Sequence, residues 1–329
     1  MAQLLKKILI STSITAGMGL AIGAPASAAS ITGAKFDASY TASADYLLYC
    51  INGAGTQTED CTNSGGTLQG VLDDGAAGNV ELDANSEAAG GWGDAVSFTG
   101  QLNGKDITIS SLTEDDWTDE LGLAWVTDAL GALVGQNQAA LTAIASNPML
   151  APGQAAALNS LVNGPGLSFA ATSLWTELAA DKSPLARLSD PNVSYVTQDG
   201  DASGEISIGL IGHANALENP HYSSIFVDGL ADLLDVPAAV IGGAGLSFSA
   251  SELVKIVYNG ETHYEYSFKA DATGVTEASD DFSHSGEYVV NIDGMEMEPP
   301  ASTPEPSAMI GMAALVGLYA GKRKLQKNA

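Results

Sequence analysis

The sequence predicts an α+β fold in which a β-rich N-terminal part, a helical middle and C-terminal strands follow one another. Three observations indicate it. Short apolar runs broken by Gly and Asn fill residues 31–109, apolar residues at helical spacing begin at Thr113, and short apolar runs return after Pro191. The roughly 270 residues between the two ends of the chain are enough to bury one core or two adjoining ones.

Four strands are expected in the first part, at residues 46–51, 80–82, 95–102 and 106–110. Asn103 and Gly104 separate the last two. Asn-Gly between two apolar runs favours a two-residue turn, because both residues tolerate the left-handed backbone that this turn requires. We therefore expect a tight hairpin here.

The helical middle begins with the acidic run at residues 113–116, which is typical of a helix N-terminus. Trp117, Leu121 and Trp125 follow at helical spacing. The two tryptophans could form a platform for a sugar ring, but Trp at this spacing is more typical of a buried core.

Two further short helices are expected at residues 139–145 and 153–162, with Asn147 and Pro148 as the break between them. Another is expected at residues 226–234, because Pro237 follows and cannot continue a helix. The closing strands are expected at residues 193–197, 205–211, 264–270 and 288–292.

A faint internal repeat links residues 164–169 (GPGLSF) with residues 243–248 (GAGLSF). Each copy follows a helical pattern, so the pair could mark a duplicated junction between helix and strand. A chance match of two six-residue segments is the equal alternative.

Composition describes a strongly acidic protein, with 12 Lys and Arg against 39 Asp and Glu and a net charge of −27. Six of the basic residues lie in the two ends, so the central part is more acidic still. A surface of this sign repels nucleic acid and anionic lipid, and it excludes both as partners. An acidic, solvated surface without a dedicated site is the simplest interpretation.

Cys50 and Cys61 are the only cysteines, and a Gly-rich stretch surrounds them. In an exported protein such a pair most simply forms a disulfide, and closing so short a loop contributes on the order of 2 to 3 kcal/mol. A metal site would need a neighbouring His or further Cys, and a redox role would need Cys-x-x-Cys spacing. Neither pattern is present.

The best candidate for a bound ion is the turn that contains Asp199, Asp201, Ser203 and Glu205. Alternating oxygen side chains around a Gly imitate the first half of a calcium-binding loop. The twelfth place should be a bidentate Glu, and here it is Leu210. We therefore prefer a plain Asp/Gly turn of a hairpin, and calcium is the only cofactor that the sequence suggests.

Catalysis finds little support in the sequence. His213, His221, His263 and His284 lack a metal-ligand spacing, and there is no Gly-x-Ser-x-Gly nucleophile turn. The sequence cannot identify the carboxylate pair of a glycoside hydrolase, because with so many acids any two could meet in space. The expectation is that the protein is not an enzyme.

The first 28 residues have the pattern of a secretory signal peptide. Lys6 and Lys7 provide a positive start, residues 8–22 are apolar, and Ala26-Ser27-Ala28 fits the small-residue pattern before a cleavage site. We expect cleavage after Ala28, with the exported domain at residues 29–298.

The last residues, 299–329, form an ordered series. Pro304, Glu305 and Pro306 come first, residues 308–321 are apolar, and Lys322, Arg323 and Lys324 end the series with a basic cluster. This order resembles the PEP-CTERM sorting signal of bacterial surface proteins. The resemblance implies that an exosortase-type membrane peptidase processes the tail at Pro304-Glu305-Pro306, and that Lys322, Arg323 and Lys324 are the basic stop.

An ordinary single-pass anchor is the alternative for this tail. A spanning helix needs about 20 apolar residues, and this segment is shorter and contains three glycines, which favours a transient membrane helix. Basic residues at the end stay on the cytoplasmic side, so the preceding chain should lie outside.

These expectations combine into an exported cell-surface or extracellular-matrix protein without catalytic activity, sorted by an exosortase-type system. The resemblance implies a link to extracellular polysaccharide and biofilm, and signal peptidase and exosortase as processing partners. The alternative is a secreted carbohydrate-binding module that uses Trp92, since Trp92 lies in a Gly-rich loop, or else Tyr222. A secreted hydrolase is the third hypothesis.

Overall fold

The computed structural model describes residues 28–42, 45–51, 57–64, 66–73, 78–83, 92–277 and 284–294. The chain divides into two units, Met1–Gly294 and Met295–Ala329, and all described residues belong to the first. The signal peptide up to residue 27 and the whole sorting tail lie outside the described residues.

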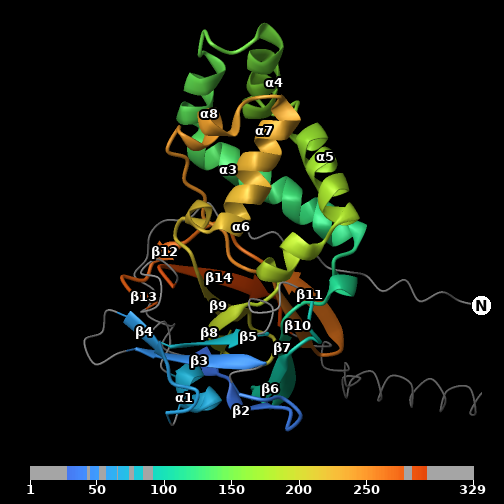
Figure 1. Cartoon of the computed structure of the whole chain (residues 1–329). Coiled ribbons are helices and arrows are strands. Elements are labelled where there is room, and N and C mark those ends of the chain that lie inside the picture. The colour runs from blue at the N-terminus through green and yellow to red at the C-terminus, as the bar shows by residue number, and fades with distance from the viewer. Residues whose placement is uncertain are drawn as a thin grey trace, which may run out of the picture. The chain divides into compact units, whose positions relative to one another are not determined.

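The described part combines helices and sheets, in agreement with the α+β expectation (Figure 1). One sheet has five antiparallel strands in the order β11-β10-β7-β6-β2. They are β2 (Thr32–Phe36), β6 (Ser97–Leu102), β7 (Lys105–Ser110), β10 (Val254–Tyr258) and β11 (Glu261–Glu265).

Two tight hairpins build this sheet. Asn103 and Gly104 join β6 to β7 with φ of 47° and 75°, which confirms the predicted turn. Asn259 and Gly260 join β10 to β11 with φ of 52° and 80°. The second hairpin uses the same left-handed Asn-Gly pair and was not predicted from the sequence.

The other sheet has nine strands in the described residues. Its main path is β12-β14-β9-β8-β5-β3-β4-β13, and β1 also pairs with β8. The strands are β1 (Ala28–Ser30), β3 (Tyr46–Ile51), β4 (Gln57–Asp60), β5 (Asn79–Leu82), β8 (Asn192–Asp199), β9 (Ile206–Gly212), β12 (Asp271–Ala272), β13 (Thr276–Glu277) and β14 (Gly286–Ile292). Strand β1 begins at the last residue of the expected signal peptide, so cleavage there would leave Ala29 and Ser30 in the strand.

The two sheets bury one apolar side each. Phe98, Ile109 and Ile256 of the five-stranded sheet and Ile208 and Val290 of the nine-stranded sheet are all fully buried. Between the sheets, the Gln198 amide of β8 donates to the Tyr258 hydroxyl of β10 at 3.3 Å and accepts from the Asn103 amide at 3.1 Å. These bonds satisfy a buried amide that would otherwise destabilise the interior.

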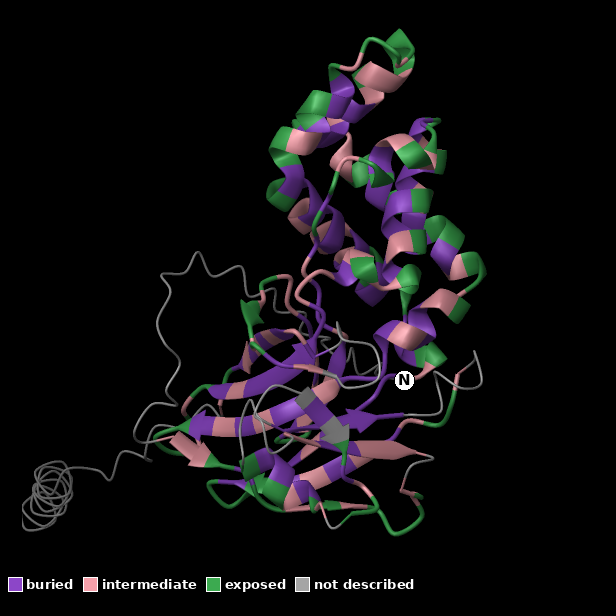
Figure 2. Ribbon diagram, turned by 60° about the vertical axis from the view of Figure 1, so that its left-hand side comes forward, coloured by how far each residue is buried: buried purple, intermediate pink, exposed green. Residues whose placement is uncertain are grey.

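The helices pack together on one side of the sheets, around a core of their own (Figures 1 and 2). The longer ones are α3 (Asp119–Ala145), α4 (Pro152–Val162) and α5 (Leu167–Ala180), and the short ones are α6 (Pro220–Ser223), α7 (Gly229–Leu234) and α8 (Ala238–Gly242). Trp117 and Trp125 are fully buried and pack edge to face, so both are core residues. No described helix is both long and apolar enough to cross a membrane. A separate short helix, α1 (Leu68–Asp73), packs against strands β2, β5 and β8.

Several expected elements differ from the structure. The helix predicted at residues 139–145 is the last part of α3, which continues through a non-helical Asn137. Helix α5 and strand β10 were not predicted, and the strand expected at residues 264–270 is β11, at Glu261–Glu265. The predicted helix at residues 226–234 exists as the continuous run of α6, a π-helical turn at Ser224–Asp228, and α7.

Candidate functional site

The outer face of the five-stranded sheet carries a row of small side chains, three threonines and one valine. Register pairs Thr99 with Thr108, Thr108 with Val257 and Val257 with Thr262, so these four residues cross the sheet side by side. All four are partly exposed, whereas their neighbours along each strand are buried, apart from Glu261 at the start of β11. This alternation makes one face of the sheet core and leaves the other open to ligands.

An open groove of 490 Å³ lies at one end of this face. It exists where β2 departs from regular pairing with β6, because the register shifts between Thr32 and Lys35 and Gly33 has φ of +64°. Its lining is polar apart from the glycines and consists of Thr32, Gly33, Lys35, Thr99, Gly100, Gln101, Asp106 and Thr108.

The groove offers hydrogen-bonding groups of both kinds. The Gln101 amide donates to the Asp106 carboxylate at 3.1 Å, and Lys35 is exposed beside them. Threonine hydroxyls can donate and accept, as the hydroxyls of a sugar do. The groove contains a single carboxylate, Asp106, so it does not hold the carboxylate pair that a glycoside hydrolase needs.

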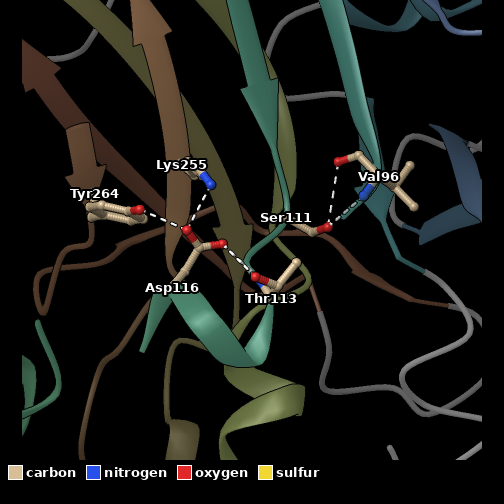
Figure 3. A network of polar contacts seen from close by, with 6 residues as sticks. All are labelled: Val96, Ser111, Thr113, Asp116, Lys255 and Tyr264. Carbon is tan, nitrogen blue, oxygen red and sulfur yellow. Dashed lines mark hydrogen bonds and ion pairs between the residues drawn. The ribbon is translucent and has the colours of Figure 1, made fainter. Parts of the chain in front are cut away.

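A buried polar contact lies on the same face of the sheet, at strands β10 and β11 (Figure 3). Asp116 accepts from the Lys255 ammonium at 2.6 Å and the Tyr264 hydroxyl at 2.7 Å through one oxygen. Its other oxygen accepts from the backbone N–H and hydroxyl of Thr113, both at 2.9 Å. We call Asp116, Lys255 and Tyr264 the Asp116 clamp, since it ties the start of the helical part to strands β10 and β11.

The electrostatics of the clamp indicate a structural role. Burial alone would raise the pKa of Asp116, but the hydrogen bonds from Lys255, Thr113 and Tyr264 hold it below its ordinary value. Burial and the Asp116 carboxylate raise the pKa of Tyr264. A catalytic tyrosine base needs the opposite shift, so the clamp is suited to holding elements together.

A second group of acids lies where the helical part meets the sheets. Burial raises the pKa of Glu252 well above its ordinary value, and the charges of Asp190 and Glu81 add to this effect. Glu252 is half-buried as a residue, while its carboxyl group is enclosed and accepts a long bond of 3.4 Å from the Asn192 amide. A carboxyl group in this setting favours the protonated form.

Asp83 lies just beyond the end of β5 and is 5% exposed. Burial raises its pKa to about 6, with contributions from the charges of Asp45 and Asp94. Asp83 also has a left-handed backbone, with φ of 68°. Among the described residues, no three His, Cys, Asp or Glu side chains are arranged to hold a metal ion.

The turn at residues 199–205, for which the sequence favours a plain Asp/Gly turn over a calcium loop, is held by hydrogen bonds of its own. Asp201 accepts from the backbone N–H and hydroxyl of Ser203 at 2.8 and 2.6 Å, and these bonds lower its pKa. The Gln198 amide donates to the carbonyl oxygens of Ala202 and Gly204. Asp199 and Glu205 are exposed, and the backbone N–H of Asp199 donates to the carbonyl of Glu205 at 3.0 Å. The four residues therefore form a hairpin turn closed by its own hydrogen bonds.

The two aromatic residues suggested as sugar platforms lie in different settings. Trp92 is half-buried against the helical core, and Tyr222 is 2% exposed. Tyr222 is therefore wrong as an exposed platform, because it fills the core. Neither residue lines the groove.

The disulfide and the histidines can also be placed. Cys50 and Cys61 form a disulfide with a Cα separation of 5.8 Å, which confirms the predicted pair. His213 contacts the Asn219 amide at 3.2 Å and His284 contacts the Asn79 amide oxygen at 3.3 Å. His213 and His284 thus belong to separate local contacts.

Sequence reasoning missed the groove residues. Lys35, Thr99 and Asp106 belong to three strands that are ordinary in composition, and only the sheet register brings them together. The bulge signal at Gly33 was the one local hint. Comparison of the chain with protein-family models, with curated proteins and with solved structures gave no match.

Proposed function

We propose that this is an exported cell-surface or extracellular-matrix protein, sorted by an exosortase-type system and without catalytic activity of its own. The ordered tail with Pro304, Glu305 and Pro306, together with the signal peptide at residues 1–28, supports this. The sorting tail and the signal peptide up to residue 27 lie outside the described residues. The link to extracellular polysaccharide depends on the resemblance of the tail to the PEP-CTERM signal.

The structural observation that carries the proposal is the Cys50–Cys61 disulfide, which joins β3 to the residue after β4. Stable disulfides form in oxidising compartments outside the cytoplasm. The acidic composition agrees with a soluble exterior domain that does not bind nucleic acid.

The test is the intact mass and location of the protein in its native host. The wild type should lose residues 1–28 and its tail, and should be found at the surface or in the medium. Replacing Pro304, Glu305 and Pro306 by Ala should leave the tail attached and the protein in the membrane.

A matched control replaces the nearby Pro299 and Pro300 by Ala, which keeps the motif and should keep processing. A wild-type chain that retains its tail in the membrane would contradict sorting, and it would favour the plain anchor instead.

A second function, binding of a neutral polysaccharide, is favoured by the groove. Its hydroxyl and amide side chains match the hydrogen-bonding groups of sugars. The groove lacks an aromatic platform in its lining, so weak binding by many repeated contacts is expected.

This second function is tested by binding of the protein to the surface polysaccharide of its host. Thr99→Val with Thr108→Val removes two hydroxyls at nearly constant volume and should weaken binding about tenfold. Thr262→Val lies in the same row of the sheet but outside the groove, and it should bind as the wild type does. Equal binding by all three proteins would exclude the groove.

A further inference from the structure

The chain contains a long stretch without any charged residue. Between Asp128 and Glu177 there is no Asp, Glu, Lys, Arg or His. Charged residues make up 16% of the protein, so a stretch of this length would ordinarily carry several. The uncharged residues also lie together in one region of the fold, so the molecule has an uncharged surface there.

In the structure this stretch forms the second half of α3, all of α4 and most of α5. We call residues 129–176 the uncharged tip. Helix α4 and the turn before it lie at the end of the helical part farthest from the sheets (Figure 1). The nearest acids in sequence to the neighbouring helix α8 are Asp232 of α7 and Asp235, which follows α7. The Gln154 amide of the tip donates to the Asp235 carbonyl.

The tip also exposes large apolar side chains. Of the described residues, Met149, Phe169 and Leu123 are the exposed large hydrophobics, at 87%, 71% and 37%. The two most exposed lie in the tip, at the turn before α4 and in the first turn of α5. Figure 2 shows these helices with a buried side toward their neighbours and an exposed side outward.

The exposed residues between Met149 and Phe169 are small or neutral. Ala156 and Asn159 lie on the outer side of α4, and Thr172 continues the exposed side of α5. No charged side chain of the tip itself opposes the approach of another apolar face, and the nearest exposed acids, Asp232 and Asp235, lie beside α4. An anionic membrane would require basic residues that the tip lacks.

The net charge limits where two copies of this chain can meet. Two copies of a chain with a net charge of −27 repel each other over most of their surfaces. In a symmetric dimer the same face meets itself, so any charge near the axis faces its own copy. The uncharged tip is a described surface that can meet itself without this repulsion.

We propose that the uncharged tip is a self-association surface at which a second copy of this chain docks, with Phe169 and Met149 buried in the contact. This goes beyond the sorting proposal and does not depend on it. The contact is apolar, so it strengthens as salt screens the repulsion between the acidic bodies.

The first test is sedimentation velocity on the protein isolated from its host, over a range of concentrations. A dimer is expected, and Phe169→Glu should raise its Kd about tenfold or more. Leu123→Glu adds the same charge to an exposed Leu outside the tip and should leave the Kd within about twofold. Raising the salt from about 50 mM to about 500 mM should tighten the wild-type dimer.

Circular dichroism checks that each variant is folded, and Phe169→Ser with Met149→Ser provides a milder pair. A protein that stays monomeric at all concentrations would overturn the proposal. A dimer that both tip variants leave unchanged, or one that weakens with salt, would do the same.

The second test identifies the occupant in the cell. A photo-crosslinking amino acid at position 169 of the full chain should give a product of twice the mass, with the crosslink between two tips. The same probe at position 123 should not. Crosslinks from position 169 to a different protein, to polysaccharide or to lipid, without a homodimer, would contradict a second copy as the occupant.

Discussion

Asn137 of α3 and Ser247 exchange two hydrogen bonds across 110 residues of sequence. The Asn137 amide donates to the Ser247 carbonyl at 2.5 Å, and the Ser247 N–H donates to the Asn137 side-chain oxygen at 2.9 Å. The same amide also donates to the Leu133 carbonyl at 2.8 Å. Asn137 has φ of −120° inside the helix, so its side chain links the kink in α3 to a segment that has no regular structure.

Asn137→Asp tests this pair at constant shape. The carboxylate still accepts from Ser247 N–H but cannot donate to the two carbonyls, and at 7% exposure it is largely buried. We expect a loss of about 2 to 4 kcal/mol in the free energy of unfolding, measured by urea denaturation. Asn163→Asp, at an exposed helix end, is the control and should cost less than about 1 kcal/mol.

Gly122 and Gly131 of α3 should respond in opposite directions to the same change. A Cβ on Gly122 would collide with the ring of Trp175 on α5, whereas a Cβ on Gly131 would have Leu167 as its nearest neighbour, at 3.9 Å. Ala in a helix interior is favoured over Gly by about 1 kcal/mol. Gly131→Ala should therefore raise the melting temperature, and Gly122→Ala should lower it. A stabilising Gly122→Ala would show that α3 and α5 are not this close.

The Asp116 clamp should be worth more than an exposed ion pair. Asp116→Ala leaves Lys255, whose side chain is 26% exposed, and Tyr264 without their acceptor. We expect a loss of about 2 to 4 kcal/mol in the free energy of unfolding, and about 1 kcal/mol for Tyr264→Phe. Because the folded-state pKa of Asp116 is lowered, its contribution is present at neutral pH and is lost as the pH falls below about 4.

A double-mutant cycle of Asp116→Ala with Lys255→Met separates the pair from the cost of each change. A coupling energy near zero would contradict the clamp as a stabilising contact.

The contribution of Asp83 to the free energy of unfolding should depend on pH with the opposite sign. Its folded-state pKa of about 6 lies above the ordinary value, so its contribution to stability is full below about pH 4 and is lost as the pH rises through 6. The free-energy difference between the wild type and Asp83→Asn should therefore fall by on the order of 1 to 3 kcal/mol between pH 4 and pH 7.5. Urea denaturation at several pH values measures it. Parallel profiles for the two proteins would contradict the shift.

The two copies of the short repeat show where local pattern stops determining structure. Residues 167–169 begin helix α5, in which Ala170 and Trp175 are buried in the helical core. Residues 246–248 are not helical, because Asn137 and Asn215 accept hydrogen bonds from the N–H groups of Ser247 and Phe248. Nearly the same six residues therefore form a helix start in one place and irregular chain in the other, and a duplicated junction is excluded.

The elements that the sequence alone determined are those whose cause is local. The hairpin at Asn103 and Gly104, the helix indicated by the spacing of Leu121 and Trp125, and the Cys50–Cys61 pair each depend on a few neighbouring residues, and all are present. The mixed α+β class follows from the same local patterns. The uncharged stretch at residues 129–176 is likewise visible in the sequence, although its place at the end of the helical part is not.

The tertiary structure decided what depends on residues far apart in the chain. Lys35 and Thr99 reach one groove because β2 pairs with β6, and Asp116 meets Lys255 because β10 pairs with β7. Backbone preference and hydrophobic periodicity act over a few residues, whereas strand register joins Lys35 to Thr99, and a buried hydrogen bond joins Asp116 to Lys255 at a separation of 139 residues. The local signals could therefore predict the elements, and only their packing could assemble the groove, the clamp and the uncharged tip.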